Sequence, residues 1–131
     1  MTPSLNLPAV LVVALGGAIG SVARYVAGML LLPVSSGFPV GTLVVNVLGA
    51  FLIGAFAGLA VSSEGDHLLR LALMTGFCGG FTTFSTFSAE TLLLIQEGRT
   101  VRALWYIGSS LVLGLAATAF GLLLARPRAG A

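Results

Sequence analysis

Long apolar stretches separated by short polar turns run along the whole sequence. The apolar stretches lie at about 8–32, 40–61, 68–95 and 103–125. A helix that crosses a bilayer needs about 20 mostly apolar residues. The segments between the stretches, PVSSGFP, SSEGDH and EGRTVR, are rich in turn-forming or charged residues. The pattern predicts an all-α integral membrane protein, with four transmembrane helices in a single domain covering residues 1–131.

The third stretch differs from the others because small and hydroxyl residues fill its middle. Positions 75–88 read TGFCGGFTTFSTFS. The adjacent glycines Gly79 and Gly80 weaken a helix interior, and the hydroxyls of Thr82 and Thr83 can bond freed backbone groups or cap a new helix. We therefore expect a helix that is broken near the middle of the membrane. Carbonyls and helix ends at such a break can coordinate ions where they line protein or water.

Two polar side chains stand out in the first two stretches, because polar groups in lipid usually face protein or water. Arg24 shares a helix face with Gly16 and Gly20, and such glycines let a second helix approach closely. It is either a fixed positive charge that attracts an anion or an arginine that snorkels to the headgroups. Asn46 shares a face with Thr42, and its amide can donate to an anion or bridge two helices.

Aromatic and hydroxyl residues of the later stretches allow two interpretations each. Phe84 and Phe87 lie three apart on one helix face, where their electropositive ring edges can line a path for a small anion or simply pack. In the fourth stretch Tyr106, Ser110 and Thr118 roughly share a face. Their hydroxyls either line a pore or serve in helix packing, where such residues are common.

Composition excludes several classes of function. Hydrophobic residues make up 57% of the 131 residues and charged residues 8%, against about 25% charged in a soluble domain. The six basic residues are arginines that form no run, so nucleic-acid binding has no support. A single cysteine, Cys78, and a single histidine, His67, leave no disulfide, metal cluster or Ser/His/Asp arrangement. An enzyme is therefore not expected.

The arginines are balanced between the two ends of the expected helices. One side would carry Arg70, Arg126 and Arg128, and the other Arg24, Arg99 and Arg102. An excess of basic residues on one side normally sets orientation, and no excess exists here. The balance indicates either a chain that inserts in both orientations and pairs antiparallel, or a small chain with a weak bias.

The residues so far described resemble a known family. GGAIGSVARY at 16–25, GTLVVNVLG at 41–49 and TGFCGGFTTFSTFSAE at 75–90 look like the three signature stretches of the Fluc (CrcB) fluoride channels. The resemblance implies a dual-topology, antiparallel homodimer that spans the cell (cytoplasmic) membrane several times. It also implies a passive channel with two antiparallel pores, which exports fluoride from the cytoplasm and lowers its toxicity.

The resemblance also implies roles for individual residues. The fluoride pathway would contain Asn46, Phe84, Phe87, Ser110, Thr118 and Arg24, with Thr83 and Ser85 nearby. A structural sodium ion (Na+) at the dimer interface would be held by the backbone carbonyls of Gly79 and Thr82 from each subunit. The sequence departs from some relatives at Gly114, where they place a serine, so the row of hydroxyls in the fourth stretch is interrupted.

Two other functions compete with this interpretation. A small proton-coupled multidrug exporter has a similar size, but it needs an acidic residue in its first helix. The only charge in the first stretch is Arg24, which would repel a cationic drug. A purely structural membrane subunit is the other alternative, and it leaves the polar middle of the third stretch without a purpose.

Overall fold

The chain is helical over the residues that the structure, a computed structural model, describes, which are 5–62 and 67–126. No strand occurs within these two ranges, and the all-α prediction is confirmed. The helices in chain order are α1 (Leu7–Leu31), a 3-10 turn η1 (Leu32–Val34), α2 (Val40–Ser62), α3 (His67–Arg70), a π-helical segment η2 (Leu71–Cys78), α4 (Gly79–Phe81), α5 (Phe84–Gln96) and α6 (Thr100–Ala125).

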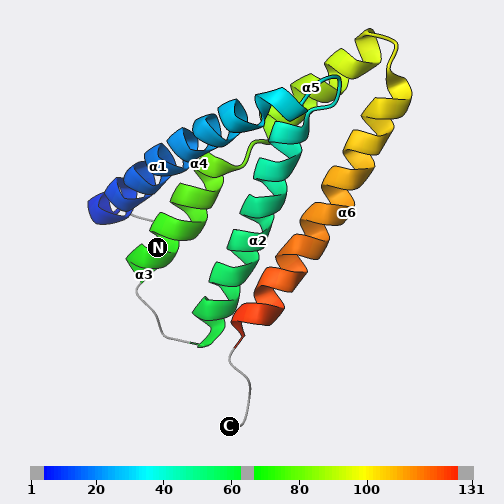
Figure 1. The fold of residues 1–131 in the computed structure, drawn as a ribbon. Helices are drawn as coiled ribbons and strands as arrows, with labels where there is room; N and C mark the ends of the chain where they lie inside the picture. Colours follow the sequence, from blue (N-terminus) through cyan, green and yellow to red (C-terminus); the bar gives the residue numbers. More distant parts are fainter. Residues whose placement is uncertain (1–4, 63–66, 127–131) are drawn as a thin grey trace.

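Two pairs of helices form the body of the molecule. Helices α2 and α6 run side by side, and α1 lies against the continuous helix made by α3, η2 and α4 (Figure 1). Two residues separate the start of helix α5 from the end of α4, and α5 leads to the turn before α6. This arrangement places α4 next to both α1 and α2, and α5 next to α2 and α6.

Three helical segments in the described ranges are long and apolar enough to cross a membrane: Leu7–Val34, Val40–Leu59 and Thr100–Ala125. The third apolar stretch of the sequence is instead divided into a helical part at 67–81 and helix α5. Each part is shorter than the roughly 20 residues that a straight crossing requires.

The helix break lies at Thr82 and Thr83, just after the two glycines that suggested it. Both residues are extended, with ψ 160° at Thr82 and φ −151° at Thr83, whereas Gly79 keeps helical angles of φ −63° and ψ −38°. The glycines have another role than breaking the helix, because a Cβ added at Gly80 would collide with the carbonyl oxygen of Gly17. Gly80 is therefore needed for close packing against α1, and the two threonines make the turn.

Glycines allow the backbones of the paired helices to touch. A Cβ at Gly16 or Gly20 of α1 would collide with carbonyl oxygens of η2. A Cβ at Gly54 of α2 would meet the Thr118 carbonyl oxygen, and one at Gly121 of α6 would meet that of Phe51. Small residues at membrane helix interfaces permit such approaches, so these glycines fix the two pairs described above.

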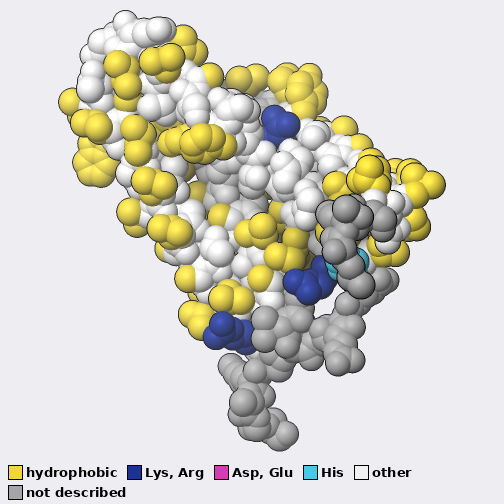
Figure 2. All heavy atoms as spheres, turned by 180° about the vertical axis from the view of Figure 1, so that it is seen from behind, with side chains coloured by type: hydrophobic (Ala, Val, Ile, Leu, Met, Phe, Trp, Pro, Cys, Tyr) yellow, Lys and Arg dark blue, Asp and Glu magenta, His cyan; other side chains and the backbone are white. Residues whose placement is uncertain are grey.

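The surface of the single chain is strongly apolar. Among the described residues, the large side chains buried below 2% exposure are only Tyr106, Val45 and Cys78, while many leucines, valines and aromatics stand exposed. Figure 2 shows one face, on which hydrophobic side chains are spread widely and basic side chains occur at isolated places. A soluble monomer rarely exposes so much apolar surface, so the chain is a membrane protein surrounded by lipid or by other protein.

Replacing one interface glycine tests this packing. We expect Gly121→Ala to lower stability by about 1–3 kcal/mol, because its methyl group overpacks the contact between α6 and α2. The matched control is Gly108→Ala in the same helix, where the added carbon meets no atom of another helix within 4 Å. The measurement is the unfolding temperature of each purified variant in detergent. Equal unfolding temperatures for the two variants would contradict the packing.

Candidate functional site

The backbone of Thr83 at the helix break is bonded in both directions by one side chain. The Asn46 amide nitrogen donates to the Thr83 carbonyl oxygen at 3.1 Å, and the Thr83 N–H donates to the Asn46 amide oxygen at 2.8 Å. An unpaired backbone group in a membrane costs several kcal/mol, at an order of magnitude. Asn46 on α2 therefore supplies the hydrogen bonds that a continuous third helix would have made.

Arg24 bonds the other side of the break. Its Nε donates to the Gly80 carbonyl oxygen at 3.0 Å, and the Ser21 hydroxyl lies 3.5 Å from the same oxygen. This carbonyl stands at the end of α4, where helix carbonyls lack partners and a positive charge is favoured. The face of α1 that carries Arg24 is thus packed against protein, with Gly16 and Gly20 buried beside it.

The start of α5 is capped by the hydroxyl that the sequence suggested. Thr83 is the N-cap, and its Oγ1 accepts a hydrogen bond from the Thr86 backbone N–H at 3.1 Å. The same hydroxyl lies 2.9 Å from the Thr86 hydroxyl and 3.2 Å from that of Ser85. On the α4 side, the Thr82 hydroxyl donates to the Cys78 carbonyl oxygen at 2.8 Å. The break is therefore surrounded by hydroxyl groups.

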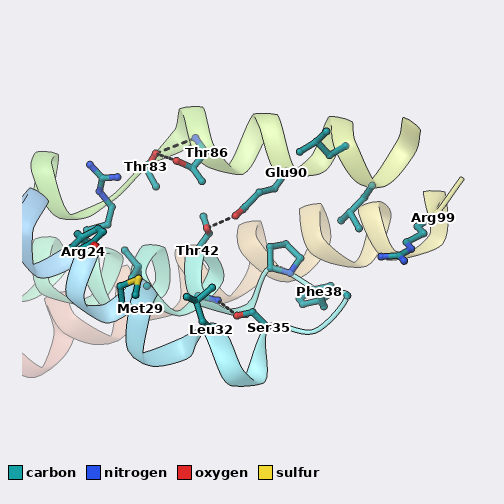
Figure 3. Close-up of a pocket in the computed structure, with 18 of the residues that line it drawn as sticks. Arg24, Met29, Leu32, Ser35, Phe38, Thr42, Thr83, Thr86, Glu90 and Arg99 are labelled. Atoms are coloured by element: carbon teal, nitrogen blue, oxygen red, sulfur yellow. Dashed lines mark hydrogen bonds between the residues drawn. The ribbon is translucent and has the colours of Figure 1, made fainter. Parts of the chain in front are cut away.

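A pocket of about 500 Å³ opens beside the break. Figure 3 shows Arg24 towards one end, Arg99 at the other, and Thr42 and Glu90 between them. Thr83 and Thr86 also line it, so the pocket reaches the start of α5. The pocket joins residues from α1, α2 and α5 with the turn that precedes α6.

Glu90 forms a polar cluster in the middle of this pocket. Its two carboxylate oxygens accept hydrogen bonds from the Thr42 hydroxyl at 2.9 Å and from the Tyr106 hydroxyl at 2.7 Å. The residues predicted for the fluoride pathway include none of these three, although the sequence allows the Tyr106 hydroxyl to serve in either pore lining or helix packing. A signal was present, since Thr42 lies four residues before Asn46 and Tyr106 four before Ser110. Their meeting joins three helices, which no spacing within one helix could reveal.

The two phenylalanines of α5 have different surroundings. The Phe84 side chain is 79% exposed, whereas the Phe87 ring lies 5.0 Å from that of Tyr106 and packs on the cluster of buried residues Leu94, Ala103 and Tyr106. The two phenylalanine ring centres are 5.7 Å apart. Phe87 thus serves in packing within the chain, while Phe84 points outward.

Ser110 and Thr118 of α6 do not line the pocket. The Ser110 Oγ is buried and has no hydrogen-bond partner among the described residues. Thr118 donates instead to the Gly114 carbonyl oxygen of its own helix at 3.0 Å. A Cβ added at Gly114 would meet no atom of another helix within 4 Å, so a side chain at this position would not clash with the rest of the chain.

The break also frees a carbonyl group at Gly79. In a continuous helix the Gly79 oxygen would accept from the Thr83 N–H, but that N–H is bonded to Asn46. Gly79 is exposed in the single chain. The described residues contain no group of three or more His, Cys, Asp or Glu side chains that could hold a metal. A cation here would depend on backbone oxygens.

Comparisons with known proteins agree with one another. Residues 11–122 match the family described as "CrcB-like protein, Camphor Resistance (CrcB)". The chain is 50% identical over 123 residues to a protein from Bordetella petrii, covering 93% of this chain and 94% of that one. It is 49% identical over 118 residues to one from Pseudomonas syringae pv. maculicola, covering 89% and 93%. Each relative is named "Fluoride-specific ion channel FluC".

Arg24 offers a direct test of how the break is held. We expect Arg24→Met to lower the unfolding temperature in detergent, because the Gly80 carbonyl then keeps only the 3.5 Å contact with the Ser21 hydroxyl, a loss of about 1–3 kcal/mol. Arg24→Lys keeps a charged donor, so it should recover part of the stability. If Arg24→Met unfolds at the same temperature as the unmodified protein, Arg24 does not cap the end of α4.

Proposed function

The chain belongs to the CrcB family of fluoride channels, and we propose that it carries fluoride out of the cytoplasm passively as an antiparallel homodimer in the cell membrane. It is a fluoride-specific ion channel of a membrane-spanning family rather than an enzyme. The observation that supports the finer proposal most is the polar break in an otherwise apolar helix, bonded by Asn46 and Arg24. Irregular backbone at membrane depth is tolerated where it lines a cavity or is buried in protein.

The proposed pathway begins in the pocket and passes the break. Arg24 lines the pocket and uses only its Nε in a hydrogen bond with the described residues, which leaves its terminal nitrogens to attract an anion. Asn46 has a second amide hydrogen that makes no bond with them either. With the hydroxyls of Thr83 and Ser85, these donors replace part of the water that fluoride gives up. Several weak sites let an ion leave as well as arrive.

The aromatic rings and the hydroxyls of α6 continue this path. Phe84 and Phe87 would turn their ring edges, which are electropositive, toward the ion. The unpartnered Ser110 hydroxyl is a donor without an acceptor in the described chain, and an ion or a water would satisfy it. Thr118 follows two helical turns later, and in this proposal a water beside Gly114 would bridge the interval between the two hydroxyls.

A second copy of the chain completes the proposed pathway. Phe84 and Gly79 are exposed in the single chain, although both lie next to the break. Four spans, with the continuous helix α3–η2–α4 and α5 together as the third, and the balanced arginines fit a chain that inserts in both orientations. In an antiparallel dimer the partner would cover these residues, and each subunit would contribute to two pores.

A structural sodium ion is the proposed cofactor of this dimer. The Gly79 carbonyl has lost the Thr83 N–H to Asn46, and the Thr82 carbonyl belongs to the extended turn itself. Oxygen atoms are the ligands that hard cations prefer. Two such carbonyls from each subunit would hold sodium at the interface, where it would join the two breaks.

Conduction needs no energy source in this proposal. A membrane potential that is negative inside drives an anion outward, by about 2.3 kcal/mol per charge for each 100 mV. A proton-coupled drug exporter would need an acidic residue in its first helix, and α1 has none. The acidic side chain in the middle of the pocket, Glu90, is bonded to two hydroxyls instead.

Fluoride release from liposomes tests the proposed function. Purified protein in liposomes loaded with potassium fluoride should release fluoride rapidly to an electrode once a potassium ionophore is added. Liposomes loaded with potassium chloride serve as the comparison, and they should release little chloride. Release of neither ion by folded, dimeric protein would contradict the channel.

Exchanging the rings of α5 tests the proposed path. We expect Phe84→Ile and Phe87→Ile each to lower fluoride release roughly tenfold, which corresponds to one lost ring-edge contact of about 1.4 kcal/mol. The control is Phe120→Ile on α6, whose ring lies 6.0 Å from that of Phe51 and outside the proposed path. If both α5 variants release fluoride at the unmodified rate, the rings take no part in conduction.

Sodium removal tests the proposed cofactor. An ion that binds only the folded dimer stabilises it by mass action. The unfolding temperature should therefore rise with sodium concentration. Potassium or N-methylglucamine at the same ionic strength should not replace sodium. The measurements are the unfolding temperature and the dimer fraction in detergent. If both are the same in all three salts, no sodium ion stabilises the dimer.

A further inference from the structure

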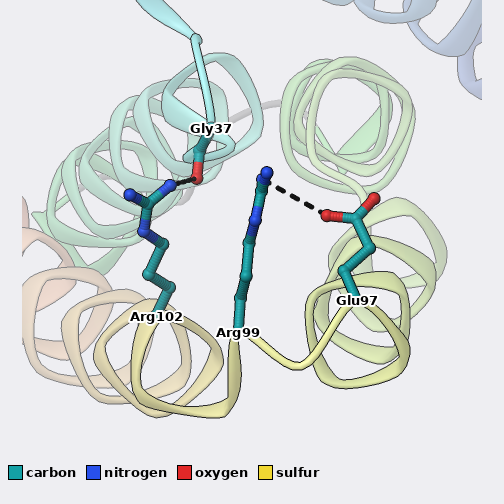
Figure 4. A network of polar contacts seen from close by, with 4 residues as sticks. All are labelled: Gly37, Glu97, Arg99 and Arg102. Atoms are coloured by element: carbon teal, nitrogen blue, oxygen red, sulfur yellow. Dashed lines mark hydrogen bonds and ion pairs between the residues drawn. The ribbon is translucent and has the colours of Figure 1, made fainter.

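The outer end of the pocket carries more positive than negative charge. Arg99 lines the pocket, and its Nη1 lies 3.2 Å from a carboxylate oxygen of Glu97. Arg102 donates from Nη1 to the Gly37 carbonyl oxygen at 2.8 Å, and Gly37 also lines the pocket. Figure 4 shows Arg99 between the Arg102–Gly37 contact and Glu97. We call these four residues the mouth of the pocket.

The positive charge stands where a helix would normally avoid it. Arg99 is the N-cap of α6, Arg102 lies in its first turn, and that turn contains no acidic residue. A helix N-terminus carries about half a positive charge, so acidic residues are favoured there and arginines are not. Glu97 compensates one arginine, and the second is left uncompensated. A local preference that is broken without an evident gain in stability commonly marks a functional position.

The charged side chains of the mouth are also exposed, so their charges act on ions in the surrounding solution. The Arg99 and Glu97 side chains are 48% and 54% exposed, and an ion pair this exposed contributes little to stability. Arg102 keeps its charge while it bonds the neutral Gly37 carbonyl. The mouth lies at the opposite end of the pocket from Arg24, as Figure 3 shows for Arg99. An anion that enters from this end meets these charges first.

We propose that Arg99 and Arg102 form an electropositive mouth that concentrates fluoride at the pocket and so raises its rate of access, while Glu97 opposes them. This role rests on the proposed function, because it needs fluoride to reach the break through this pocket. A single charge about 10 Å away in water changes the local concentration of a monovalent anion about twofold. Salt screens the effect, since the Debye length falls from about 30 Å at 0.01 M to about 3 Å at 1 M.

The experiment compares fluoride currents of mouth variants in planar bilayers of neutral lipid at low and at high ionic strength. At low salt, we expect Arg99→Gln and Arg102→Gln each to lower the current about twofold, and Glu97→Gln to raise it by a similar factor. At high salt all three should match the unmodified protein. Arg99→Lys and Arg102→Lys keep the charge, so they should keep the current at both salt concentrations.

A distant charge provides the matched control. Arg70 on α3 is exposed and does not line the pocket, so Arg70→Gln removes the same charge without touching the mouth. It should change the low-salt current less than either mouth variant does. An equal change would mean that net charge, and not the mouth, sets the current.

Other results would overturn the inference in distinguishable ways. Unchanged low-salt currents in the mouth variants would exclude concentration of fluoride there. A loss that is the same at low and high salt would mean that Arg102 only holds the turn at Gly37 in place. An unmodified protein that carries no fluoride current at all would instead overturn the proposed function on which the inference rests.

Discussion

A helix that breaks in an apolar chain leaves backbone N–H and C=O groups that hydrocarbon cannot bond. Here the Asn46 side chain bonds both groups of Thr83, and Arg24 bonds the Gly80 carbonyl. Because Asn46 takes the Thr83 N–H, the Gly79 carbonyl is released for another ligand. The same exchange turns Thr83 into the cap of α5 and brings its hydroxyl to the pocket. The site of this fluoride channel thus depends on one side-chain amide, which supplies the hydrogen bonds that Thr83 would make in a continuous helix.

Close packing makes this exchange possible. Arg24 reaches Gly80 because Gly16 and Gly20 let α1 touch η2. Gly80 lies so close to the Gly17 carbonyl that any side chain at this position would collide with it. The pairing of α2 with α6 through Gly54 and Gly121 places Tyr106 and Thr42 on either side of Glu90. The glycines therefore determine where the polar groups meet, although they carry no chemistry of their own.

The sequence predicted those features that depend on neighbours along one helix. The face shared by Arg24, Gly16 and Gly20 follows from spacing, and the cap at Thr83 follows from a hydroxyl beside a weak helix. The position of the break was harder, because Gly79 and Gly80 looked like its cause until the collision with Gly17 showed what Gly80 is for. The cluster around Glu90 could not be predicted, since its members come from three helices and meet only after packing.

Amide hydrogen exchange at Thr83 tests the central claim most directly. The measurement is made by NMR on the fluoride-conducting protein, with Asn46→Ala for comparison. We predict that the Thr83 N–H exchanges slowly in the unmodified protein, because it donates to Asn46 at 2.8 Å, and rapidly in the variant. Slow exchange in both proteins, or rapid exchange in both, would contradict an account in which Asn46 holds the break.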